Sequence, residues 1–134
     1  MSKDKLYIFD TTLRDGAQTE GVDFSVNDKN KIAQILSKIG VDYVEGGWPG
    51  ANPVDTEFFD NPPDLGSTKF TAFGMTKKNG VSADNDPNLS PLVNASCKTV
   101  CVVGKTWDFQ VKTALGIKND ENLINIKETA KHFI

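Results

Sequence analysis

The chain has 134 residues, of which 38% are hydrophobic and 25% are charged, and its net charge is −3. These values are ordinary for one globular domain and argue against a disordered chain. The scattered lysines offer no basic surface for nucleic acid, and no apolar run approaches the roughly 20 residues needed to cross a bilayer. We therefore expect a cytoplasmic protein that binds neither nucleic acid nor membranes.

The predicted elements alternate between short strands and helix-length segments. The helix after the first strand begins with the S-x-x-D pattern of Ser25 and Asp28, and Gly40 is typical of a helix end. Residues 46–50, G-G-W-P-G, should close the second strand, because a central strand rarely tolerates such a stretch. The predicted order is a strand at 6–9, a helix after Ser25, a strand at 41–45, a short helix at 55–59, a strand at 69–73, a helix beginning near Pro91, a strand at 98–103 and a helix at 121–134.

This alternation predicts an α/β fold in which right-handed crossovers build a parallel sheet. No linker or low-complexity tract divides residues 1–134, so we expect a single domain. The last helix pattern runs to Ile134 without a terminal cap. We therefore interpret the chain as part of a larger fold.

The cysteine and histidine content predicts neither a disulfide nor a Cys/His metal site. Cys97 and Cys101 lie four positions apart around one predicted strand, which is too far for a disulfide. His132 is the single histidine and follows no predicted strand. We expect both cysteines to be reduced structural residues without a functional role.

In parallel α/β folds, functional side chains gather on the loops after the carboxyl ends of the strands. Four segments occupy such positions in this sequence. They are residues 10–18, 45–53, 74–78 and 104–110.

The first of these loops, D-T-T-L-R-D-G-A-Q, carries the most chemistry. Asp15 offers hard carboxylate oxygens for Mg²⁺ or Mn²⁺, and Arg14 offers a permanent positive charge for a developing oxyanion. Gly16 is predicted to allow a tight backbone turn behind them. The alternative from the dipeptide alone is an ordinary solvated ion pair on the surface.

The loop after the second strand contains three further candidates, each with a structural alternative. Glu45 is either a polar member of the site or a hydrogen-bonded structural acid. Trp48 is either a substrate contact or a hydrophobic lid over the strand end. Asn52 is either a ligand or a turn former.

Several motifs together resemble the DRE-TIM metallolyase superfamily. This superfamily includes 2-isopropylmalate, homocitrate and citramalate synthases and hydroxymethylglutaryl-CoA lyase. The opening motif D-T-T-L-R-D-G-A-Q carries the resemblance to the superfamily. The blocks T-E-G-V-D-F-S-V-N-D-K, G-V-D-Y-V-E-G-G-W-P-G-A-N-P-V-D-T-E-F-F and V-V-G-K-T-W-D-F resemble the citramalate synthase branch most.

The resemblance implies the N-terminal half of a (β/α)₈ TIM barrel, as a partial HMGL-like domain over residues 1–134. By matching positions it implies that Asp15 is a metal ligand and that Arg14 stabilises the substrate or transition-state oxygen. Glu45 would be a polar member of the same site, and Gln18 would support the loop or touch the bound acid. The implied cofactor is a divalent metal ion, Mg²⁺, Mn²⁺ or Zn²⁺.

Two departures from the family pattern affect these expectations. The His-x-His pair that supplies the other metal ligands in the family is absent from these 134 residues, so we expect this chain alone to be inactive. Gln110 stands where relatives often have histidine after W-D-F. An amide donates a hydrogen bond but does not shuttle protons at neutral pH.

The activity implied by the resemblance is an acyl transfer in isoleucine biosynthesis. Acetyl-CoA and pyruvate condense to (R)-citramalate and CoA, and Trp48 would favour so small an acceptor. The resemblance also implies a homodimer for the full-length protein. Two alternatives stay open: the same chemistry on another 2-oxo acid, as in 2-isopropylmalate or homocitrate synthesis, and an incomplete, inactive half-barrel.

Overall fold

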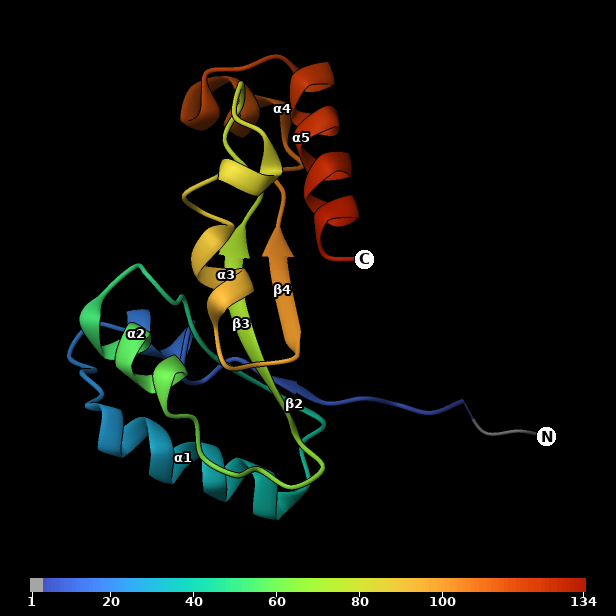
Figure 1. Cartoon of the computed structure of the whole chain (residues 1–134). Helices are drawn as coiled ribbons and strands as arrows, with labels where there is room; N and C mark the ends of the chain where they lie inside the picture. Colours follow the sequence, from blue (N-terminus) through green and yellow to red (C-terminus); the bar gives the residue numbers. More distant parts are fainter. Residues whose placement is uncertain (1–3) are drawn as a thin grey trace. The chain divides into compact units, whose positions relative to one another are not determined.

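The computed structural model describes residues 4–134, in which strands and helices alternate along the chain (Figure 1). The strands form one sheet in the order β1-β2-β3-β4, and β1, β2 and β3 pair in parallel. The predicted α/β fold is therefore confirmed. The strands are β1 (Phe9–Asp10), β2 (Tyr43–Gly47), β3 (Lys69–Met75) and β4 (Thr99–Val103), and the helices are α1 (Val26–Ile39), α2 (Pro53–Asp60), α3 (Ser90–Asn94), α4 (Asp108–Gln110) and α5 (Asn119–His132).

The chain divides into two compact units. The first unit contains the chain up to Phe73 together with Ala95–Cys101, and the second contains Gly74–Asn94 and Val102–Ile134. Strands β3 and β4 each begin in the first unit and end in the second. No helix within residues 4–134 is long and apolar enough to cross a membrane.

The first strand is shorter and begins later than predicted. Regular pairing begins at Phe9, opposite Tyr43. At Ile8 the backbone N–H binds the Asp42 side chain instead of a strand carbonyl. The Ile8 N–H donates to the Asp42 carboxylate at 2.8 Å, and its carbonyl accepts from the backbone N–H groups of Asp42 and Tyr43 at 3.0 Å. Leu6 lies before this point and is 84% exposed.

Helix α1 begins and ends as predicted. The Asp28 N–H donates to the Ser25 hydroxyl at 3.2 Å, and the Ser25 N–H donates to the Asp28 carboxylate at 3.1 Å, which completes a capping box. Gly40 adopts a left-handed conformation, with φ of 89°, at the C-terminal end. Helices α1 and α2 pack against each other and against β2 (Figure 1). The core of the first unit consists of Leu13, Ala33, Val41, Val44, Phe58 and Leu65.

The prediction that Gly46 and Gly47 close the second strand is wrong, because both belong to β2. A Cβ atom on Gly46 would overlap the ring of Phe70, so the strand needs glycine here to approach its neighbour. Glu45 pairs with Thr71 and Gly47 pairs with Ala72, which leaves Gly46 as the extra residue of a β-bulge. The bulge explains why a glycine pair sits inside a central strand.

The predicted helix around Pro91 and the remaining strands are present, with bounds that differ by one or two residues. One region was not predicted: α4 is followed by a π-helical turn at Val111–Leu115. Trp107 and Phe109 are each 57% exposed, so this segment buries little besides Val111 and shows no apolar periodicity.

Helix α5 is present but buries a polar face. Asn122, Asn125 and Thr129 are at most 5% exposed, whereas Leu123 and Ile124 are more than half exposed. The buried side chains bind backbone groups: the Lys77 N–H donates to the Thr129 hydroxyl at 3.0 Å, and the Asn122 amide donates to the Lys105 carbonyl at 2.8 Å. Polar contacts to the backbone of Lys77 and Lys105 therefore hold α5 in the second unit.

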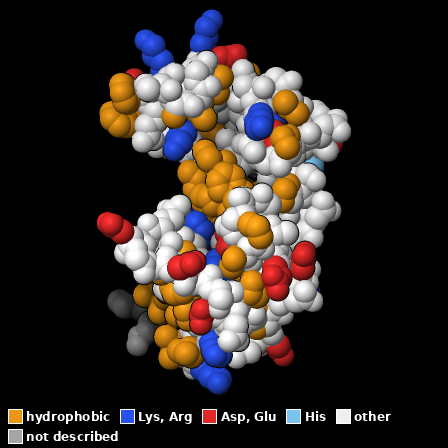
Figure 2. Space-filling model, turned by 90° about the vertical axis from the view of Figure 1, so that its left-hand side faces the viewer, with side chains coloured by type: hydrophobic (Ala, Val, Ile, Leu, Met, Phe, Trp, Pro, Cys, Tyr) orange, Lys and Arg blue, Asp and Glu red, His pale blue; other side chains and the backbone are white. Residues whose placement is uncertain are grey.

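Large hydrophobic side chains remain exposed on the described residues. Figure 2 shows hydrophobic side chains, in orange, reaching the surface on the face drawn. Leu6, Tyr7, Ile39 and Leu123 are all more than half exposed. The described residues therefore do not enclose all of their own apolar surface.

Candidate active site

Arg14, in the loop after β1, and Glu45, within β2, form a largely buried ion pair. The Arg14 Nε donates to Glu45 Oε2 at 2.8 Å. The Glu45 side chain is 1% exposed and the Arg14 side chain is 21% exposed. Burial of Leu13 at 0% exposure anchors the loop just before Arg14. The two residues that were predicted to share a site therefore lie in direct contact.

Asp15 is placed differently from its neighbour. Its carboxylate lies 3.3 Å from Arg14 Nη1, and its side chain is 62% exposed. The backbone N–H groups of Arg14, Asp15 and Gly16 all donate to the Thr11 carbonyl at 2.8–3.2 Å, which curls the loop tightly. Arg14 therefore has one solvated carboxylate partner, as the surface-pair alternative proposed, and one buried partner.

Gly16 is not required for this turn, contrary to the sequence prediction. Its φ is outside the positive region where glycine is favoured, and a Cβ there would meet only Thr12 at an ordinary 3.6 Å. The turn instead depends on the shared Thr11 carbonyl.

An aromatic side chain supports Arg14 from β3. The Arg14 guanidinium carbon lies 4.0 Å from the centre of the Phe73 ring, within the range of a cation–π interaction. Trp48 packs edge-on against the same ring, with 5.6 Å between ring centres. Sequence reasoning did not identify Phe73, although its place near the end of the third strand was a usable signal.

Cys101 on β4 borders Glu45. Burial raises the pKa of the Cys101 thiol, and the neighbouring Glu45 carboxylate raises it further, while Arg14 acts in the opposite direction. Cys97 and Cys101 are both free thiols, which agrees with the expectation of two reduced cysteines. Nothing in the sequence indicated that Cys101 lies beside the Arg14–Glu45 pair.

The remaining predicted residues have different surroundings. Asn52 caps α2: its side-chain oxygen accepts from the Asp55 N–H at 2.8 Å, so the turn-former alternative describes its contacts. The Trp48 N–H donates to the Asp55 carboxylate at 2.9 Å. Gln18 ends a short 3₁₀ turn and is exposed, and within residues 4–134 its side chain makes no hydrogen bond. Gln110 lies in the second unit on α4, where it is exposed.

The described part of the chain does not contain a complete metal site. Among residues 4–134 no group of three or more His, Cys, Asp and Glu side chains could hold a metal. The imidazole of His132 pairs with Asp84 at 3.3 Å within the second unit. The Asp15 carboxylate offers hard, largely exposed oxygens of the kind that divalent cations prefer.

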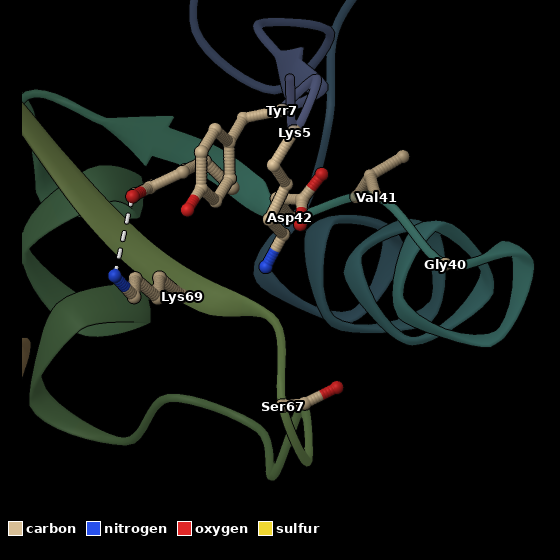
Figure 3. Close-up of a pocket in the computed structure, with 8 residues that line it drawn as sticks. Lys5, Tyr7, Gly40, Val41, Asp42, Ser67 and Lys69 are labelled. Carbon is tan, nitrogen blue, oxygen red and sulfur yellow. Dashed lines mark hydrogen bonds between the residues drawn. The ribbon is translucent and has the colours of Figure 1, made fainter. Parts of the chain in front are cut away.

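A pocket lies at the opposite ends of the strands in the first unit (Figure 3). It has a volume of about 300 Å³, and the Lys69 ammonium at its rim donates to the Tyr43 hydroxyl at 3.2 Å. Tyr43 and Lys69 begin β2 and β3, so this pocket faces the amino-terminal ends. Side chains at that end of a parallel barrel usually serve stability.

Comparison with known proteins identifies the family of the chain. Residues 5–133 match the HMGL-like family. The chain is 49% identical to the (R)-citramalate synthase of Geobacter sulfurreducens, with 92% of this chain and 23% of that protein covered. It is 44% identical to the (R)-citramalate synthase of Aquifex aeolicus, with 96% and 25% covered. It is 37% identical to 2-isopropylmalate synthase 1 of Caldanaerobacter subterraneus, with 98% and 32% covered.

The fold also matches a solved structure. The crystal structure of the Bacillus subtilis HMG-CoA lyase superimposes with a TM-score of 0.68 over 96% of this chain and 42% of that chain, at 20% identity. The four strands and their helices are therefore part of a TIM barrel, as predicted. The chain spans about a quarter of the length of the (R)-citramalate synthases that it matches. The resemblance drawn from the motifs is confirmed, and the chain belongs to the HMGL-like family.

Proposed function

We propose that the protein containing this chain is an (R)-citramalate synthase, a cytoplasmic acyltransferase of isoleucine biosynthesis that works as a homodimer. Five (R)-citramalate synthases are 40–49% identical over at least 92% of the chain. The 2-isopropylmalate synthases that align over a similar share are 31–37% identical. The observation that carries the proposal is the largely buried Arg14–Glu45 pair, beside the exposed Asp15 carboxylate.

In the proposed reaction, acetyl-CoA loses a methyl proton to a base, and the resulting enolate forms a carbon–carbon bond to the keto carbon of pyruvate. The electron pair of the C=O bond moves onto the keto oxygen, which is then protonated. Water cleaves the thioester and releases the CoA thiol and citramalate. The charge that must be stabilised therefore develops on the former keto oxygen of pyruvate.

Arg14 has the donors to meet that charge. A guanidinium carries five N–H bonds in a fixed fork. Glu45 takes Nε–H, and Asp15 lies beside Nη1, while no residue of 4–134 accepts from the donors on Nη2. Glu45 and the Phe73 ring hold the guanidinium plane before substrate arrives, and donors fixed in advance lower the reorganisation needed in the transition state.

Asp15 is the residue of this chain that would hold a divalent cation, Mg²⁺, Mn²⁺ or Zn²⁺. Such a cation supplies Lewis-acid polarisation of the keto group when bound. Trp48, packed against Phe73, would border the acceptor's side chain and favour the methyl group of pyruvate over a branched chain. The roles of Gln18 and Asn52 toward substrate stay predictions.

The test is turnover by the whole protein. CoA release is followed with a thiol reagent, using acetyl-CoA with pyruvate, 2-oxoisovalerate or 2-oxoglutarate, and the product is identified by mass spectrometry. We expect the highest kcat/KM with pyruvate, citramalate as product, and loss of activity in EDTA that Mg²⁺ or Mn²⁺ restores. An R14M variant controls for thioester hydrolysis. A higher kcat/KM with 2-oxoisovalerate or 2-oxoglutarate would overturn the proposal in favour of the corresponding synthase, and no acyl transfer would overturn it altogether.

A further inference from the structure

A lysine on α1 is buried among apolar residues of the first unit. Lys29 is 3% exposed. Its ammonium donates to the Leu13 carbonyl at 2.8 Å, to the Gly46 carbonyl at 2.9 Å and to the Asp55 carboxylate. An ammonium has three donors, so all of them have partners inside the protein.

The two carbonyls flank the candidate active-site pair. The Leu13 carbonyl belongs to the peptide bond that leads into Arg14, and Gly46 directly follows Glu45. A single ammonium group therefore ties together the backbone just before Arg14 and the backbone just after Glu45. This link holds in place the two backbone segments that carry the 2.8 Å contact between Arg14 and Glu45.

The carboxylate partner extends the link to Trp48. Asp55 uses one oxygen for Lys29 and the other for the Trp48 N–H at 2.9 Å. Gly47 permits this approach: its φ is 146°, and a Cβ there would lie about 2.5 Å from the Asp55 carboxylate. Asp55 thus joins α2 to the loop after β2.

A contribution to stability does not by itself explain why the ion pair of Lys29 and Asp55 is buried here. Removing two charges from water is costly, and well-packed apolar residues of similar size often stabilise a core equally well. The apolar alternative would, however, leave the Leu13 and Gly46 carbonyls without their shared donor. An apolar pair of side chains could not donate hydrogen bonds to those carbonyls.

We propose that Lys29 and Asp55 are positioning residues, whose buried ion pair sets the location of Arg14, Glu45 and Trp48. They act through these residues and do not touch substrate themselves. The kinetic part of the inference rests on the proposed function, because it requires that Arg14 and Glu45 take part in turnover.

The test compares two buried lysines in the whole protein. Lys77 is 6% exposed and donates to the Val81 carbonyl and the Glu128 carboxylate at 2.8 and 3.0 Å, all within the second unit. We expect K29M to lower kcat by about 10- to 100-fold, since a displacement of about 1 Å in a catalytic group has effects of this size. K77M removes a buried ammonium from an ion pair whose carboxylate, Glu128, is 49% exposed, and it should keep kcat within about 3-fold at a temperature where both variants are folded.

A double variant separates positioning from stability. In K29M the Asp55 carboxylate is left buried without its cation, and K29M/D55N removes that charge, so the melting temperature should rise relative to K29M. We expect kcat to stay low, because methionine donates nothing to Leu13 and Gly46. Recovery of kcat together with the melting temperature would show a merely structural role and overturn the inference.

A second readout does not depend on turnover. Cys101 borders Glu45, so displacement of Glu45 should speed iodoacetamide modification of Cys101 relative to Cys97, measured by peptide mass spectrometry. We expect a rise in K29M and none in K77M. If the wild-type protein transfers no acetyl group, the proposed function fails while this readout still tests the positioning. Wild-type Cys101 reactivity in folded K29M would overturn the positioning itself.

Discussion

Arg14 and Glu45 are 31 positions apart in the sequence and share a hydrogen bond of 2.8 Å between Nε and Oε2. The contact joins the loop after β1 to the middle of β2 in the first unit. It fixes the guanidinium by its Nε edge, above the ring of Phe73, and among residues 4–134 the Nη2 donors have no partner. The predictions below follow from this arrangement.

Replacing Arg14 by lysine should be severe although the charge is kept. A lysine ammonium is a point charge that cannot contact Glu45, stack on Phe73 and present a second donor edge together. We expect R14K to lower kcat by about 10²- to 10³-fold, the usual effect of losing an oxyanion donor. Steady-state kinetics of the whole protein measure the effect, with circular dichroism as the folding control. Activity near wild type would contradict a role for the guanidinium fork.

Replacing Glu45 by glutamine should change the chemistry of Cys101. The Glu45 charge is one cause of the raised pKa of this thiol, and Arg14 opposes it. Without that charge the pKa falls, a larger fraction of Cys101 is thiolate at pH 8, and E45Q should react faster with iodoacetamide. Cys97 is the internal control, because burial raises its pKa and Glu45 is not among the causes. Equal acceleration at both cysteines would instead indicate general loosening of the structure.

Asp15→Asn should remove metal-dependent turnover and leave the fold intact. The Asp15 side chain is 62% exposed, so its amide replacement loses only the solvated contact with Arg14. We expect the melting temperature without metal to match wild type, and the stabilisation on adding Mn²⁺ to be lost, because an ion stabilises only the state that binds it. Differential scanning fluorimetry and CoA release measure the two effects. Unchanged Mn²⁺ stabilisation would exclude Asp15 as a ligand.

Trp48→Ala should relax the choice of acceptor. The side chain packs on Phe73, while its backbone N–H is held by Asp55 and is unaffected by the change. We expect kcat/KM for pyruvate to fall and the ratio of 2-oxoisovalerate to pyruvate to rise by about 10-fold or more, since one or two methylene-sized groups in a pocket are worth about that factor. An unchanged ratio would place Trp48 away from the acceptor.

Gly46→Ala should destabilise the protein despite the usual benefit of replacing glycine. Fewer unfolded conformations would favour alanine by about 0.4–1 kcal/mol. The new Cβ, however, would overlap the Phe70 ring and press on Phe58, and overpacking costs about 1–3 kcal/mol. Gly16→Ala is the matched control, since its Cβ meets only ordinary contacts. Urea unfolding of both variants checks the sign: equal stabilities would mean that β2 has room at Gly46.

Local rules explain the parts of the fold that the sequence predicted well. The capping box of Ser25 and Asp28 and the left-handed Gly40 depend on neighbours within one turn of helix, so the pattern alone placed α1. The strand ends were predicted well enough to bring Arg14 and Glu45 into one candidate site, because parallel strands share one carboxyl edge.

Long-range contacts explain what the sequence did not predict. Lys29 is buried because the carbonyls of residues 16 and 17 positions away accept from it. The signal was present: Lys29 lies three and four positions before Ile32 and Ala33, on the same face of α1. A lysine on an apolar helix face does not by itself reveal which distant groups accept its hydrogen bonds. The same holds for Cys101, whose neighbour Glu45 lies on a different strand.

The bulge at Gly46 makes the number of residues between Glu45 and Trp48 as important as their identity. Because two residues of β2 span one residue of β3 here, deleting Gly46 would restore simple pairing with Gly47 still opposite Ala72, and it would remove the backbone carbonyl that accepts from Lys29. Lys29 would then lose one of its three acceptors, although no functional residue had been replaced. Libraries that seek new acceptors in this family should therefore vary the residue types around this segment and hold its length constant.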